Sequence, residues 1–97
     1  MAYFTQEFLR FFMDLAPNNN KEWFDENRKR YEQHAREPFK AFTTDLIHAL
    51  KPHMNIGSLE AKDCIFRINR DIRFSKDKTP YKLHMSAAIA PGGKKDM

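Results

Sequence analysis

Residues 67–82, RINRDIRFSKDKTPYK, hold the densest group of side chains in the sequence that could perform chemistry. Six of these sixteen residues are basic and two are acidic, so the segment has a formal charge of +4, which equals the net charge of the whole 97-residue chain. A surface that coats nucleic acid would spread its positive charge more widely. The charge distribution therefore indicates one localised site.

The residues around this group alternate between apolar and polar side chains, as in a β-hairpin. A period of two predicts antiparallel strands over about 64–74 and 81–90, joined by the loop SKDKTP. The alternation places Arg70 on the apolar face, where a guanidinium needs a carboxylate partner. We therefore assign Arg70 a structural role and expect a carboxylate of the helices to pair with it.

A register that pairs Phe74 with Tyr81 brings basic side chains face to face. Arg73 then lies opposite Lys82, and like charges in such positions cost energy unless an anion lies between them. The register predicts a site for phosphate or carboxylate. A solvated polar face with cross-strand ion pairs would produce the same pattern. The expected ligand-binding residues are Arg67, Arg73, Lys78, Tyr81 and Lys82.

The same register predicts an acid–base pair. Asp71 lies opposite His84, and a carboxylate there would orient the imidazole and stabilise its charged form, as a general acid or base requires. Asp71 and His84 are therefore the candidate catalytic residues. A register shifted by two residues would instead place His84 opposite Arg73. The residues alone do not decide whether the chain is an enzyme.

The other residues of ligand type do not form a recognised site. His48 and His53 are five residues apart, whereas the histidines of a zinc-binding helix are four apart, and Cys64 is the single cysteine. We expect no metal and no cofactor. Asp71 and Asp77 lie among six cations, which favours salt bridges, and we assign Asp77 a structural role.

Helices are expected before the hairpin. Apolar residues at helical spacing predict helices over about 5–16, 20–36 and 38–51, each ended by a proline or a turn. Asn19, three residues before Glu22, fits a capping box for the second helix. The predicted fold class is α+β, with three N-terminal helices packed on an antiparallel β-hairpin. A lone hairpin is marginal, so we expect residues 1–97 to form one domain that is the N-terminal part of a larger sheet-containing protein.

The composition limits the partners and the compartment. No apolar run approaches the ~20 residues of a membrane span, so we expect no membrane partner. A single cysteine cannot form an internal disulfide, which fits the reducing cytoplasm. We expect a small anionic ligand, phosphorylated or carboxylated. A nucleic-acid-binding or protein-interaction module that uses the same basic loop is the alternative, and the sequence does not give the oligomeric state.

The basic segment is also similar to a known family. The pattern Arg67-x-x-Arg70-Asp71-x-Arg73-Phe74, followed by Asp77-Lys78-x-x-Tyr81, resembles the signature of the bacterial family named domain of unknown function 2461. The stretch NNNKEWFDENRKRYE resembles the helical region of the same family. Members of that family are longer, so this chain resembles their N-terminal half. The family has no established activity, and the resemblance therefore implies no catalytic assignment.

Overall fold

The computed structural model describes residues 3–90 and 93, and this part of the chain contains helices but no β-strand or sheet. The predicted α+β class is therefore wrong. The two predicted strands are extended segments that pair only through two isolated antiparallel bridges, Ile65–Ala87 and Asn69–Tyr81. The bridges are four residues apart on the first segment but six apart on the second, so a regular ladder cannot form between them.

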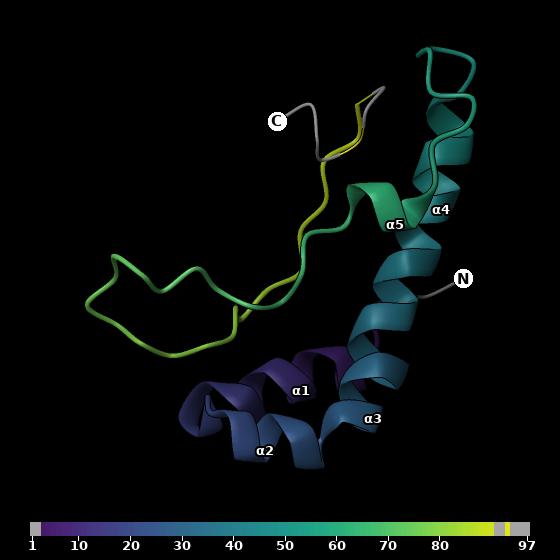
Figure 1. Ribbon diagram of the computed structural model, residues 1–97. Coiled ribbons are helices and arrows are strands. Elements are labelled where there is room, and N and C mark those ends of the chain that lie inside the picture. Colours follow the sequence, from purple (N-terminus) through teal and green to yellow (C-terminus); the bar gives the residue numbers. More distant parts are fainter. Residues whose placement is uncertain (1–2, 91–92, 94–97) are drawn as a thin grey trace.

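Figure 1 shows the order of the helices along the chain. The first, α1 (Gln6–Leu15), leads through a 3₁₀ turn, η1 (Ala16–Asn18), into α2 (Lys21–Glu26). Only Asn27 separates α2 from α3 (Arg28–Tyr31). A π-helical turn, η2 (Glu32–Arg36), connects α3 to α4 (Glu37–Leu50), and the short α5 (Ala61–Cys64) precedes the extended segments.

The helix break expected at Pro38 does not occur. The chain continues from α3 through η2 into α4 without interruption. A proline inside an α-helix has no N–H to donate, and its ring clashes with the carbonyl four residues earlier. In η2, the N–H of Glu37 donates to the carbonyl of Glu32, five residues back, so the turn is wider than an α-helical turn. This wider turn accommodates Pro38.

Three consecutive asparagines connect α1, α2 and the second extended segment. The Nδ2 of Asn18 donates to the carbonyl of Asp14 in α1 (2.9 Å). The carboxamide of Asn19 pairs with the backbone of Tyr81, because its Nδ2 donates to the Tyr81 carbonyl (2.8 Å) and its Oδ1 accepts from the Tyr81 N–H (3.0 Å). Asn20 caps α2 by accepting from the N–H of Trp23 (2.8 Å). The predicted cap, Asn19, is therefore wrong by one residue.

The core lies between the helices and the extended segments. Its larger cluster is aromatic, and the ring of Phe24 stacks on that of Tyr81 with their centroids 4.1 Å apart. A smaller cluster joins α4 to the segment that follows it. The extended segments thus gain their support from helices instead of from neighbouring strands. The buried members of the larger cluster are Phe11, Phe12, Leu15, Phe24, Tyr31, Ala35, Ile68 and Tyr81, and those of the smaller cluster are Ile47, Ile56 and Cys64.

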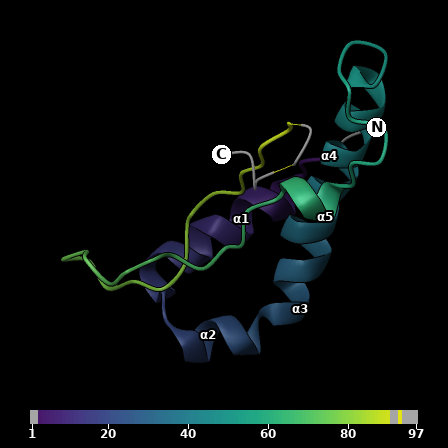
Figure 2. The same ribbon diagram turned by 45° about the horizontal axis from the view of Figure 1, so that its top comes forward.

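Residues 70–80 form a loop between the extended segments. Figures 1 and 2 show that the loop projects beyond the helices. Phe74 lies in this loop with 94% of its surface exposed, although the alternation of the sequence predicts it on a buried face. The reason is the register, because Tyr81 lies opposite Asn69 and not opposite Phe74. Both registers considered for the hairpin are therefore wrong.

Candidate anion-binding site

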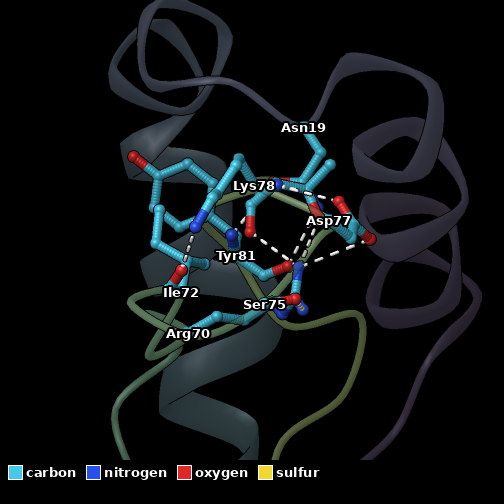
Figure 3. A network of polar contacts seen from close by, with 8 residues as sticks. Asn19, Arg70, Ile72, Ser75, Asp77, Lys78 and Tyr81 are labelled. Atoms are coloured by element: carbon cyan, nitrogen blue, oxygen red, sulfur yellow. Dashed lines mark hydrogen bonds and ion pairs between the residues drawn. The ribbon is translucent and has the colours of Figure 1, made fainter.

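Arg70 cross-links the loop of residues 70–80 through contacts of its guanidinium with other residues of the loop. Its Nη1 donates to the carbonyl (2.8 Å) and to the hydroxyl (2.6 Å) of Thr79 and lies 3.4 Å from a carboxylate oxygen of Asp77. Its Nη2 lies 3.4 Å from the hydroxyl of Ser75. Figure 3 shows these contacts converging on the guanidinium. The prediction that a carboxylate of the helices pairs with Arg70 is wrong, because the partner is in the loop.

Asp77 stabilises the end of the same loop. Its Oδ1 accepts from the backbone N–H of Thr79 (2.9 Å). This hydrogen bond, with that of the Thr79 hydroxyl and the nearby Arg70, holds the pKa of the Asp77 carboxyl below its ordinary value. These contacts support a structural role for both Arg70 and Asp77.

The lowered pKa predicts that acid opens the loop. A carboxylate whose pKa is depressed by folding stabilises the folded state above its ordinary pKa, and that contribution is lost as the pH falls through the folded pKa. We expect the Thr79 amide to lose protection from hydrogen exchange below about pH 4, near the ordinary pKa of aspartate. NMR-detected exchange measures this change.

Two variants at position 77 sharpen the same test. Asp77→Asn keeps an oxygen that can accept from the Thr79 N–H but cannot titrate, so its loop should respond less to acid than the wild-type loop does. Asp77→Ala should expose the Thr79 amide at neutral pH as well. A Thr79 amide that exchanges equally in all three proteins would contradict this account of the loop.

Asp71 pairs with Arg73 instead of His84. The Nε and Nη2 of Arg73 donate to the two carboxylate oxygens of Asp71 at 3.0 and 2.9 Å, and this pairing lowers the pKa of Asp71. Among residues 3–90 and 93, no hydrogen bond or ion pair joins Asp71 to His84, which is exposed. The catalytic role of Asp71 and His84 remains a prediction, but the cross-strand pairing on which it was based is wrong.

Both lysines that were predicted to bind an anion, Lys78 and Lys82, donate to backbone carbonyls. The Nζ of Lys78 donates to the carbonyl of Ile72 (2.6 Å), and the Nζ of Lys82 donates to the carbonyl of Arg67 (2.9 Å). Figure 3 shows Lys78 reaching the carbonyl of Ile72, and Lys78 does not line the cavity described next. The structure therefore does not gather Arg73, Lys78 and Lys82 around one space.

Arg67 and Tyr81, in contrast, line a cavity of about 370 Å³. Helices α2 and α3, the turn η2 and the start of α4 form one wall of this cavity, and α5 and the extended segments form the other. Its lining contains one carboxylate, that of Glu32, and five basic side chains. These are Arg28, Arg36, Lys40, Lys62 and Arg67.

Three of these five cations have no carboxylate partner in the described part of the chain. Arg28 pairs with Asp25 (3.2 Å), and Lys62 pairs with Glu60 (3.3 Å). Arg36, Lys40 and Arg67 form no ion pair within residues 3–90 and 93. The two arginines of the loop, Arg70 and Arg73, thus have acidic partners, whereas three cations of the cavity have none among the described residues.

Two buried tyrosines add hydroxyl groups to this lining. Tyr31 is 7% exposed and Tyr81 is 5% exposed, and neither hydroxyl has a hydrogen-bond partner among the described residues. No fully buried side-chain oxygen or nitrogen in that part of the chain lacks a partner, so both hydroxyls must reach solvent. The cavity is the open space that both side chains line. Burial raises the pKa of Tyr31 above the ordinary value of a tyrosine, so its hydroxyl is protonated and able to donate near neutral pH.

The sequence contains a signal for the cations that we missed. Arg28, Glu32, Arg36 and Lys40 recur at intervals of four residues, which places them on one side of a helix. Such a row is also typical of a solvated helix face. Only the packing of residues 62–69 against this side turns the row into the wall of a cavity.

The fold and the site define a helical protein in which two extended segments close a basic, aromatic-lined cavity. A family model described as conserved hypothetical protein (DUF2461) matches residues 7–97, so the chain belongs to that family. No curated protein and no solved structure gives a significant match. Within the described residues, no helix has both the length and the apolar character needed to cross a bilayer.

Proposed function

We propose that the protein binds a small anionic ligand, phosphorylated or carboxylated, in the basic cavity. The observation that supports this most strongly is the presence of Arg36, Lys40 and Arg67 around one space without carboxylate partners in the described part of the chain. Hydrogen bonds between ionised donors and acceptors are about twice as strong as neutral ones, so a phosphate or carboxylate group would satisfy these cations. The hydroxyls of Tyr31 and Tyr81 would supply further donors.

The shape of the site favours a small ligand over nucleic acid. A ligand pocket is concave and has apolar as well as polar lining, whereas a duplex-binding surface is extended and contacts many phosphates. The cations here surround a cavity whose lining includes the aromatic residues Phe24 and Phe66. We also propose that the protein resides in the cytoplasm, because its single cysteine does not require an oxidising compartment.

Arg67→Gln should weaken anion binding by about tenfold or more. A hydrogen bond to a charged group contributes roughly 1.5–3 kcal/mol, and about 1.4 kcal/mol corresponds to a factor of ten in affinity. We would titrate the ¹⁵N-labelled protein with inorganic phosphate and, separately, with citrate. In the wild type, the amides of residues 28–40 and 65–69 should shift, and Arg67→Gln should raise the dissociation constant for both anions.

Arg73→Gln is the matched control. Arg73 is an exposed arginine of the same basic segment, but Asp71 neutralises it and it lies outside the cavity. This substitution should therefore leave the dissociation constants unchanged. A larger loss in Arg73→Gln than in Arg67→Gln would place the anion on the loop and contradict the proposal, as would the absence of any shift with either anion.

A further inference from the structure

A second cavity, of about 620 Å³, adjoins the first along the same helix. Lys40 and Lys62 line both cavities. The second cavity lies between the middle and end of α4 and the stretch of residues 57–62 that leads into α5. The two cavities therefore adjoin at Lys40 and Lys62, and we call them together the groove.

One wall of this groove is a row of polar side chains at intervals of four residues. The row continues that of the first cavity into α4 through Thr44 and His48, which line the second cavity, and Lys51 follows at the end of the helix. From residue 28 to residue 48, a helical rise of 1.5 Å per residue gives a row about 30 Å long. Its members are Arg28, Glu32, Arg36, Lys40, Thr44 and His48.

The second cavity has both charged and apolar lining. Lys51 lines the second cavity and forms no ion pair within residues 3–90 and 93, whereas Glu60 on the opposite wall already pairs with Lys62. The lining of the same cavity also includes the apolar side chains of Ile47 and Leu59. Among the described residues, each cavity thus has at least one cation without a carboxylate partner, and the second cavity also has apolar lining.

We infer that the ligand is elongated and carries at least two phosphate groups, one bound in each cavity. This inference rests on the proposed function, because it takes the first cavity as an anion site. A compact monoanion would leave Lys51 and the second cavity without a role, whereas a chain of phosphates would satisfy both sets of cations. Phosphate is favoured over carboxylate because each group carries more charge and more acceptor oxygens.

The test compares inorganic orthophosphate, tripolyphosphate and a longer linear polyphosphate, with calorimetry and ¹⁵N NMR on the full 97-residue chain. Affinity should rise with chain length, and the amides of Thr44 and His48 should shift only with the longer anions. Lys51→Gln should weaken binding of the longest chain by about tenfold, the scale for one hydrogen bond to a charged group, and leave orthophosphate binding unchanged. Lys29→Gln, an exposed lysine outside both cavities, is the control and should change neither affinity.

The outcomes separate this inference from the proposed function. If orthophosphate binds and longer chains bind no better, or if Lys51→Gln has no effect, the elongated ligand is excluded and the anion site stands. If no phosphate compound and no citrate binds, both fail. If polyglutamate of similar charge binds more tightly than polyphosphate, the assignment to phosphate is overturned.

Discussion

Phe24→Ala should destabilise the protein by about 3–5 kcal/mol, the scale for removing a buried aromatic side chain. Phe24 is 2% exposed, its ring stacks on Tyr81, and it packs against Phe11 and Tyr31. The substitution leaves a hole where α2, α3 and the second extended segment meet. Urea unfolding followed by circular dichroism measures the loss.

Phe74→Ala is the matched control, because Phe74 is a phenylalanine of the second half of the chain that is 94% exposed. Its ring contacts the guanidinium of Arg73 (5.6 Å from the ring centroid) and is otherwise open to solvent. We expect a change within about 0.5 kcal/mol, as for most surface substitutions. Equal losses in the two variants would show that Phe74 is buried and that the described position of the loop is incorrect.

Asn19→Ala should cost about 2–4 kcal/mol and also weaken anion binding. The substitution leaves the N–H and the carbonyl of Tyr81 without their partners. Each unsatisfied buried group costs roughly 1–3 kcal/mol, and because these two are only part-buried, we expect the lower part of the summed range. It also releases the backbone that positions the Tyr81 hydroxyl at the cavity. Urea unfolding gives the first effect, and a phosphate titration gives the second.

Asn18→Ala is the control for the same run of asparagines. Its side chain makes one exposed hydrogen bond, to the carbonyl of Asp14, so its loss should cost no more than about 1 kcal/mol. Anion binding should not change. A variant of Asn18 that is as unstable as the variant of Asn19 would mean that the asparagines act together as a turn, and that Asn19 has no particular role in holding Tyr81.

The sequence predicts the helical part of the fold better than the extended part. Apolar residues such as Phe8, Phe11 and Leu15 recur at helical spacing, and this local property is enough to place α1. Alternation over 64–74 also indicates an extended chain. It does not determine the register between the two extended segments, because that register depends on residues far away in the sequence. The carboxamide of Asn19 fixes Tyr81 from 62 residues away, and no local pattern reveals that contact.

The site is predictable only in part, for a related reason. Arg67 and Tyr81 were expected to bind ligand, and both line the cavity. The loop residues were misjudged because each arginine has an acidic partner close in sequence: Asp71 is two residues from Arg73, and Asp77 is seven from Arg70. Such local ion pairs neutralise the charges of Arg70 and Arg73, which are then less able to bind an anionic ligand. The sequence did not identify the cations of α3, η2 and α4 as part of the site, because their role depends on which segment packs opposite them.

The π-helical turn η2 also determines how the side chains of α4 are rotated about the helix axis relative to those of α3. In an uninterrupted α-helix, positions four residues apart drift around the axis by about 40° per step, so a row from residue 28 to residue 48 would wind roughly half-way round the helix. A more loosely wound turn in the middle rotates the chain the other way and brings Lys40, Thr44 and His48 back toward the side that carries Arg28. Pro38 disfavours the regular α-helical winding at this place. The two halves of the groove are therefore aligned by a local defect in the helix, whose removal would turn one half away from the other.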